Sequence, residues 1–435
     1  MESTRARRFR SAENGNTLGW DSLAGQLVSR AVTSSRIEMR TSKLPTPTMN
    51  VDSTLLRRAD LSTIGASQTN SRRHGKVGTT AYPAFAVSGD GAVLTFQDGR
   101  TAIDLAGANG AIALGYQHPE VTDWVRRYSN KGGTLSLPSP LEVEASSMMC
   151  DAFDMDARVR WVRTGSEAVS AAVSIAQEDT GNSCVGVFDG AYHGWHPWTR
   201  QVVTLGDQLQ LLAFDRTATL QLPDGISSLA AILVESPRWT SPGTVYVERL
   251  RELREHCVKA GVPLIFDDVV YGFRFATGGL QETTGVTPDL ACFSKALGNG
   301  VPVGCVVGNP DLMRRTEYRV SSTFGGEVTG LAAASAVLSV HAMQDVCGEL
   351  RAFGTDLRNR LDLALTGSPI RVEGQPQHFR FASDSHETLD AFLTGCITHD
   401  DGVLIHRDAN NINLAMDESI IGRITATVGE VAGSL

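Results

Sequence analysis

The chain has 435 residues, of which 42% are hydrophobic and 20% are charged, and its formal net charge is −9 at pH 7. This composition is typical of a globular protein with a large core; it lacks the basic character of a nucleic-acid-binding protein, and no apolar run approaches the roughly 18 residues that span a bilayer. The seven cysteines are widely spaced without a CxxC pair, which disfavours a disulfide framework or a zinc site and predicts a reducing, cytoplasmic location.

Residues 1–75 differ in composition from the rest of the chain. They are rich in Ser, Thr and Arg, with a cluster at Arg5, Arg7, Arg8 and Arg10. Such a bias suits either a cleaved transit peptide or an N-terminal extension. Because acidic residues interrupt the segment, we favour an extension that is partly disordered or packed on the rim of the protein.

A regular pattern begins near residue 85. The stretch FAVSGDGAVLTFQDGRTAIDLA (85–106) nearly alternates polar and apolar residues and is broken at Gly89-Asp90-Gly91 and at Asp98-Gly99, which predicts a small antiparallel sheet. The following HPEVTDWVRRYSN (118–130) has helical spacing.

Short β-branched runs then alternate with longer helical patterns. Helices are predicted at SEAVSAAVSIAQ and VERLRELREHCVKAG, and strands at 159–164, 183–189, 230–236, 262–268, 290–294 and 302–308. This alternation predicts an α/β fold whose central sheet is mostly parallel, with helices on both faces. We expect residues 115–325 to form this large domain, and 76–114 with 326–435 to form a smaller α+β domain.

Polar residues stand where several of the apolar runs end. They are Gly165 with Ser166, Glu235, Asp267 and Lys295. Ligands of an open α/β sheet bind at the carboxyl ends of its strands, so these residues are the candidates for a site.

Asp267 and Asp268 end the run VPLIFDD. The pair could be a strand end with a helix-capping acid, a pair of metal ligands, or an acid directed at a buried cationic ring nitrogen. No neighbouring His or Asp supplies the spacing of a metal site, so we expect no metal. A buried carboxylate needs a partner, and a pyridinium would serve.

Lys295 ends the next apolar run, where a lysine is commonly a surface residue that extends its amine to water. Alternatively, desolvation would leave the amine nucleophilic and able to form a Schiff base with an aldehyde cofactor. The segment TGSEAVSAAVSIA (164–176) opens a helix with Gly165 and Ser166, which suits either an anion site or a plain N-cap. An anion site, an acid and a lysine together match the phosphate, ring nitrogen and aldehyde of pyridoxal 5′-phosphate.

The sequence resembles the class III aminotransferases, which are fold-type I pyridoxal-phosphate enzymes, and within that class it is most similar to the glutamate-1-semialdehyde 2,1-aminomutase branch. The resemblance spans about residues 85–430 and is carried by DLAGANGAIALGYQHPEV and GLQETTGVTPDLACFSKALGNGVPVG. It implies that Lys295 binds the aldehyde and shuttles a proton between the substrate Cα and C4′ of the cofactor. Asp267 would pair with the pyridinium nitrogen.

The same resemblance implies roles for further residues. Val269 would pack on one face of the cofactor ring, and Tyr192 would stack on the other with His193 beside it. Gly165 and Ser166 would bind the phosphate.

Two residues complete this implied site. Glu235 aligns with the acid of the family's Glu-Pro motif, although the chain reads Glu-Ser-Pro here. Thr323, in STFGGE, would reach the phosphate of a neighbouring subunit, because this family builds each active site at a dimer interface. A homodimer with shared active sites is therefore expected.

Several positions depart from the family pattern. Asn413, in NINLAMDES, stands where transaminases of this class use an arginine to clamp a substrate carboxylate. Ala108-Asn109 replaces the Ser-Trp pair of the aminomutase, and the segment 310–321 is short for its gating loop. These departures argue against glutamate-1-semialdehyde and against a simple ω-amino acid as substrate.

The sequence thus predicts an aminotransferase that moves an amino group from a small-molecule amine donor to a specialised aldehyde or ketone, such as a sugar or natural-product intermediate, by a ping-pong reaction. An aminomutase or epimerase on the same machinery is the alternative. A non-catalytic dimeric scaffold that has kept the fold is a third possibility.

Overall fold

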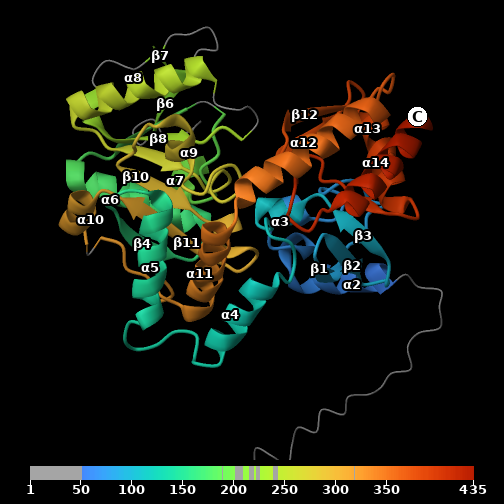
Figure 1. Ribbon diagram of the computed structural model, residues 1–435, viewed down its shortest axis with the longest axis horizontal. Helices are drawn as coiled ribbons and strands as arrows, with labels where there is room; N and C mark the ends of the chain where they lie inside the picture. The colour runs from blue at the N-terminus through green and yellow to red at the C-terminus, as the bar shows by residue number, and fades with distance from the viewer. Residues whose placement is uncertain are drawn as a thin grey trace, which may run out of the picture. The chain divides into compact units, whose positions relative to one another are not determined.

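The structure is a computed structural model, which describes residues 51–188, 190–200, 209–214, 220–221, 226–238, 243–317 and 319–435 (Figure 1). The first 50 residues of the predicted extension, with their arginine cluster, lie outside the described residues. None of the helices in the described ranges is both long and apolar enough to cross a membrane.

An eight-stranded sheet forms the centre of the fold, in the order β4-β11-β10-β9-β8-β5-β6-β7. Its strands are β4 (Arg158–Val162), β5 (Cys184–Phe188), β6 (Leu209–Phe214), β7 (Leu220–Gln221), β8 (Leu229–Glu235), β9 (Leu264–Asp267), β10 (Leu290–Phe293) and β11 (Gly304–Gly308). The five strands from β10 to β6 are parallel to their neighbours, whereas β11, β4 and β7 pair antiparallel. The predicted mostly parallel sheet is therefore confirmed.

Apolar side chains of the central strands point alternately to two cores. On β9, Ile265 packs into the core beneath α6 (Gly165–Thr180), whereas Leu264 and Phe266 enter the core on the other face. That second core receives side chains from α5 (Pro140–Phe153) and α8 (Thr244–Ala260). Burial on both faces explains why these strands read as continuous apolar runs.

The predicted antiparallel sheet forms from β1 (Ala86–Asp90), β2 (Val93–Phe96) and β3 (Thr101–Asp104), and β14 (Val403–Leu404) adds to β3 in parallel. This pairing joins the two segments that the sequence assigned to one small domain. A third sheet contains β12 (Arg371–Gln375), β13 (His378–Ala382) and β15 (Asn410–Asn411). The division into domains stays a prediction.

The remaining helices lie around these sheets (Figure 1). α11 (Val328–Met343) packs on α4 (Pro119–Ser129) and α5, while α12 (Val346–Ala364) and α13 (His386–Thr398) each pack on α14 (Glu418–Gly433). The short helices are α3 (Gly107–Gly110), α7 (Pro197–Arg200), α9 (Leu280–Thr284), α10 (Pro310–Arg315) and the 3-10 turns η1 (Ile64–Ala66), η2 (Asn70–Arg72), η3 (Ile226–Ser228) and η4 (Lys295–Gly298).

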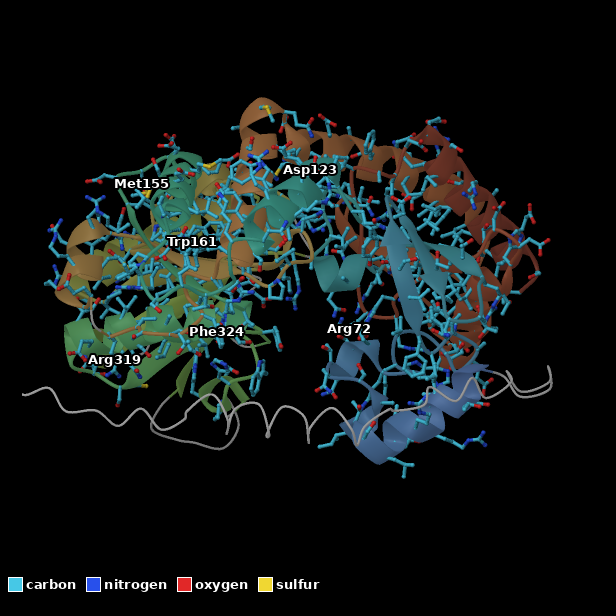
Figure 2. The ribbon with its side chains drawn as sticks, turned by 90° about the horizontal axis from the view of Figure 1, so that it is seen from below. Arg72, Asp123, Met155, Trp161, Arg319 and Phe324 are labelled. Atoms are coloured by element: carbon cyan, nitrogen blue, oxygen red, sulfur yellow. The ribbon has the colours of Figure 1, made fainter. Side chains whose placement is uncertain are left out.

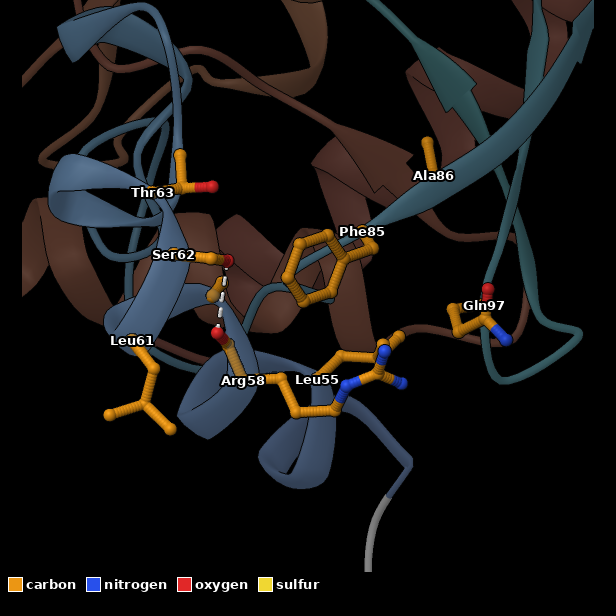
Figure 3. Close-up of a pocket in the computed structure, with 9 residues that line it drawn as sticks. Leu55, Arg58, Leu61, Ser62, Thr63, Phe85, Ala86 and Gln97 are labelled. Carbon is orange, nitrogen blue, oxygen red and sulfur yellow. Dashed lines mark hydrogen bonds between the residues drawn. The ribbon is translucent and has the colours of Figure 1, made fainter. Parts of the chain in front are cut away.

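The described end of the predicted extension begins with α2 (Val51–Ser62). Beyond α2, Ser71 accepts a hydrogen bond from Asn109 Nδ2 at 3.0 Å, so this segment contacts the rest of the protein. Between α2 and the strands β1 and β2 lies an open hollow of about 610 Å³, lined by residues that include Arg58, Phe85 and Gln97 (Figure 3). Its lining contains none of the predicted site residues.

Candidate active site

The carboxyl ends of three parallel strands bring the predicted acids and the lysine to one edge of the central sheet. In the register of the sheet, Glu235 of β8 pairs with Asp267 of β9, which in turn pairs with Cys292 of β10. Lys295 follows three residues after Cys292, as the first residue of η4. The sheet therefore places Glu235, Asp267 and Lys295 on neighbouring strand ends.

Gly165 brings the start of α6 against the same edge. A Cβ atom at this position would lie 2.6 Å from Val269 Cγ1 and 3.5 Å from Ser294 Cβ. The first of these distances is shorter than any normal contact, so a larger residue here would force Val269 or the α6 N-terminus to move. The N-terminus of α6 therefore lies next to Val269, which follows the acid pair, and next to Ser294, which precedes Lys295.

The first turn of α6 suits the binding of an anion. Thr164 caps the helix by accepting a hydrogen bond from the Glu167 amide at 3.2 Å, and Glu167 Oε2 accepts from the Thr164 amide at 3.0 Å. The other amide groups of a first turn have no partner within the helix, and the helix dipole makes this end positive. The Ser166 hydroxyl accepts a hydrogen bond from the Trp195 amide at 3.3 Å, which places it beside the loop that carries Tyr192 and His193.

Asp267 and His193 form a buried pair. Asp267 is 6% exposed and His193 5% exposed. His193 Nδ1 donates to Asp267 Oδ2 at 2.8 Å, and the Val269 amide donates to Asp267 Oδ1 at 3.2 Å. Two donors orient the carboxylate, which keeps capacity to accept from a third. His193 Nε2 is buried with no hydrogen-bond partner among the described residues.

Lys295 has an unusual backbone and an altered amine. Its φ angle is +47°, in the left-handed region, which costs roughly 1–3 kcal/mol in a residue other than glycine. The pKa of the amine is lowered to about 8, chiefly by burial and also by the charge of Arg238, while Asp267 and Glu235 oppose the shift. An amine with this pKa is neutral in a large fraction of molecules near pH 8, and a neutral amine is nucleophilic.

Glu235 links the loop after β5 to the loop after β8. Its Oε2 accepts a hydrogen bond from the Tyr192 amide at 2.9 Å, and its Oε1 contacts the guanidinium of Arg238. Burial raises the pKa of Glu235, and Arg238 opposes that shift. Tyr192 thus joins the site through its backbone, while its side chain is 57% exposed.

Asp268 points away from Asp267 into the protein. It is fully buried, and its Oδ1 accepts hydrogen bonds from Ser236 Oγ at 2.7 Å and from the Leu280 amide at 2.9 Å. Burial raises its pKa to about 7. Asp268 therefore fastens the strand ends to one another, which leaves Asp267 as the acid of the site.

Sequence reasoning missed the residues that tie this edge to the smaller sheets. Arg274 is fully buried and donates to the carbonyl oxygens of Gly110 at 3.1 Å, Ile112 at 3.0 Å and Ile412 at 2.6 Å. Asn299 Oδ1 accepts from the amides of Ala113 at 3.0 Å and Leu114 at 2.9 Å. The Asn299-Gly300 pair just after Lys295 was the available signal, because Asn and Gly mark turns with positive φ.

Thr323 is exposed in the loop before α11. Among the described residues, no hydrogen bond joins it to Lys295, Asp267 or Ser166. The loop crosses β4, since a Cβ atom at Gly325 would lie 2.9 Å from the carbonyl oxygen of Trp161. Phe324, labelled with Trp161 in Figure 2, is 55% exposed on this loop.

These residues fit pyridoxal phosphate. The close approach at Gly165 leaves a helix N-terminus for a phosphate, the oriented carboxylate of Asp267 can accept from a protonated ring nitrogen, and the amine of Lys295 can condense with an aldehyde. Within the described ranges, no group of three or more His, Cys, Asp or Glu side chains is arranged to hold a metal ion.

Comparison with known proteins shows which sequences the chain is similar to. The chain is 32% identical over 327 residues to a glutamate-1-semialdehyde 2,1-aminomutase of Thermomicrobium roseum, which covers 68% of this chain and 73% of the relative. It is also 32% identical over 265 residues to the aminomutase of the same name from Chlorobium phaeobacteroides, which covers 54% of this chain and 59% of that relative.

Solved structures share the fold. The FumI protein of Sphingopyxis sp. MTA144 in its PLP internal aldimine form superimposes with a TM-score of 0.78 at 22% identity, over 88% of this chain and 96% of that one. An omega-transaminase from Sphaerobacter thermophilus gives 0.73 at 23% identity, over 88% and 97% of the two chains. The family model described as Aminotransferase class-III matches residues 75–209 and 216–416. The predicted relationship is therefore confirmed, and the chain belongs to the class-III aminotransferases.

Proposed function

We propose that the protein is a pyridoxal-phosphate-dependent aminotransferase, which moves an amino group from a small-molecule donor to a specialised aldehyde or ketone by a ping-pong reaction. The observation that carries the proposal is the sheet register, which sets Asp267 and Lys295 on adjacent strand ends beside the glycine-lined start of α6. The family assignment supports the reaction class, and the FumI structure shows the same fold with this cofactor bound.

When bound, pyridoxal phosphate supplies an electron sink that stabilises the negative charge left at Cα when the Cα–H bond breaks. Asp267 would hold a proton on the ring nitrogen, and His193 would keep the carboxylate oriented through the 2.8 Å hydrogen bond. The amides of Gly165 and Ser166 would bind the phosphate. Val269 would pack on one face of the ring and Tyr192 on the other.

Lys295 would act both as the attachment point and as the base. Its lowered pKa of about 8 leaves roughly half of the amine unprotonated near pH 8, so that Nζ could accept the Cα proton and return it to C4′. Glu235 would hold the backbone of the Tyr192 loop in place through its 2.9 Å hydrogen bond.

We further propose that two copies of the chain share their active sites, with Thr323 directed at the phosphate of the partner. The exposed loop that carries Thr323, together with exposed Phe324, supports this arrangement. The smaller domain proposed at 76–114 and 326–435 would close one side of each site. Free, mostly buried cysteines support the proposed cytoplasmic location.

The experiment that tests the cofactor and its lysine is reduction with borohydride. Purified protein mixed with pyridoxal phosphate is expected to show a visible absorption band, and reduction should fix a phosphopyridoxyl group on the peptide that contains Lys295. K295A is expected to lose this label while keeping its far-UV circular dichroism. K259A, at an exposed lysine of α8, is the matched control and should be labelled at Lys295 like the wild type. Labelling elsewhere, or none, contradicts the proposal.

An aminomutase is the second candidate, because both relatives described above carry that name. The two functions differ in their need for an acceptor. A transferase requires a keto acid or aldehyde to complete its cycle, whereas an aminomutase rearranges one substrate without a co-substrate. Turnover that requires an added carbonyl acceptor supports the transferase, and turnover of a single amine without one supports the aminomutase.

A further inference from the structure

Arg238 stands at the end of β8 with Glu235, in the segment Glu235-Ser236-Pro237-Arg238. Its guanidinium contacts Glu235 Oε1, and the two side chains are 23% and 16% exposed. The main chain here is anchored from the third sheet, because Gln375 Nε2 donates to the Pro237 carbonyl oxygen at 3.0 Å. The arginine is therefore held at the sheet edge and partly open to solvent.

The contact with Glu235 places the Arg238 guanidinium beside the row of strand ends that leads toward Lys295. Glu235, Asp267 and Cys292 form one row across β8, β9 and β10. Arg238 and Lys295 each lie three residues beyond that row in sequence, in the segments that follow the two strands flanking β9. Two strand spacings of about 4.8 Å separate those strand ends by about 10 Å. In agreement, the charge of Arg238 contributes to the lowered pKa of Lys295.

Two other candidates among the described residues, Asn413 and Arg274, do not offer a comparable cation. Asn413 is neutral and fully buried, and its Oδ1 accepts from the Ala415 amide at 3.0 Å. Arg274 is fully buried, and its guanidinium donates to three backbone carbonyl oxygens. Arg238 is partly exposed, and one of its terminal nitrogens already contacts a carboxylate oxygen, so a carboxylate is an anion that this guanidinium can bind.

We infer that Arg238 binds a carboxylate of the amine substrate, and that Glu235 is its counter-ion when no substrate is present. The inference rests on the proposed function and specifies it: the amino donor is an amino acid rather than a simple amine. A carboxylate that approaches Arg238 replaces the contact with Glu235, so the guanidinium keeps an anionic partner in both states. Arg238 is thus a specificity-determining residue in the segment that follows β8.

The test compares two substrates that differ only in the carboxylate. The protein loaded with pyridoxal phosphate is mixed with each enantiomer of alanine, or with isopropylamine, in which a methyl group replaces the carboxylate. The loss of the visible band gives the rate constant for each. The wild type is expected to react faster with one enantiomer of alanine than with isopropylamine. R238Q should reduce this ratio of rate constants by about 10- to 100-fold, the range of a charge-assisted bidentate contact. R238K should fall between the two, because it keeps the charge but not the fork.

A second readout does not depend on catalysis. Propionate has the carboxylate but no amine, and its binding to the loaded protein is measured by isothermal titration calorimetry. R238Q is expected to weaken the binding of propionate by about 10-fold or more. Because R238Q leaves Glu235 without its cation, E235Q/R238Q is measured in parallel. R249Q removes an arginine from another i,i+3 Arg–Glu pair, on α8, and should match the wild type.

The outcomes separate this inference from the proposed function. Arg238 does not bind the carboxylate if R238Q and E235Q/R238Q bind propionate as tightly as the wild type, or if these variants slow the reactions with alanine and isopropylamine equally. In either case, a coloured and reactive wild type still supports the proposed function. Wild type that reacts faster with isopropylamine than with either alanine also contradicts the inference. Wild type that binds no pyridoxal phosphate overturns both.

Discussion

The close approach between Gly165 and Val269 gives a quantitative prediction. In G165A the new Cβ would lie 2.6 Å from Val269 Cγ1 and 3.1 Å from Cγ2, so one group must move by about 1 Å to reach normal contact. Overpacking of this size typically costs 1–3 kcal/mol, and we expect G165A to lower the free energy of unfolding by about 2 kcal/mol. The displaced α6 N-terminus should also weaken the binding of inorganic phosphate and of the cofactor.

A double-mutant cycle isolates the clash from other effects of the substitution. V269A removes both methyl groups, and the next nearest atom, Ser294 Cβ, is at an ordinary 3.5 Å. V269A alone should cost about 1–2 kcal/mol through lost burial. G165A/V269A should be more stable than the sum of the single variants by about 1–2 kcal/mol.

Urea unfolding followed by circular dichroism measures all three variants. G422A is the control, because a Cβ at Gly422 in α14 meets no atom within 4 Å, and this change should stabilise the protein by up to about 1 kcal/mol. If G165A unfolds like the wild type, or if the coupling energy with V269A is below about 0.5 kcal/mol, the structural reasoning about this contact is wrong.

Three further predictions concern buried charges. The pKa of Lys295 is lowered to about 8, so the folded apoprotein binds fewer protons than the unfolded chain between pH 8 and the ordinary lysine pKa of 10.5. The stability of the wild type relative to K295M should therefore rise with pH across that window. A difference in urea midpoints that does not change with pH contradicts this prediction. The pKa of Asp268 is raised from 3.8 to about 7, so the folded state binds more protons than the unfolded chain between these pH values. The stability of the wild type relative to D268N should therefore fall as the pH rises from about 4 to 7. A stability difference that grows with pH would be evidence against the raised pKa. R274M leaves three carbonyl oxygens without their donor and should lower the free energy of unfolding by about 3 kcal/mol or more, and a loss below about 1 kcal/mol would show that these hydrogen bonds are dispensable.

The strand ends were predictable because each depends on a local pattern. An apolar run that ends at Asp267 or just before Lys295 predicts both a strand and the residue at which it ends. The parallel arrangement then brings these strand ends together. The start of α6 was equally local, since Thr164 and Glu167 form a capping box around Gly165.

The supporting contacts were not predictable, because their partners are remote in sequence. Arg274 bonds to an oxygen 138 residues away, and Gln375 reaches the Pro237 carbonyl across the same separation. Neither contact has a local signature. The edge strand β7 was also missed, because it has only two residues and no alternating pattern can be recognised over that length.

The position of Arg274 has a consequence for how the protein matures on the ribosome. Its terminal nitrogens donate to carbonyl groups near residues 110 and 412, so this buried charge lacks one of those partners until residue 412 has left the exit tunnel. The strands that carry Asp267 and Lys295 are synthesised more than a hundred residues earlier. The nascent chain should therefore bind pyridoxal phosphate late in its synthesis. Polypeptides whose translation is arrested before residue 412 should bind pyridoxal phosphate poorly.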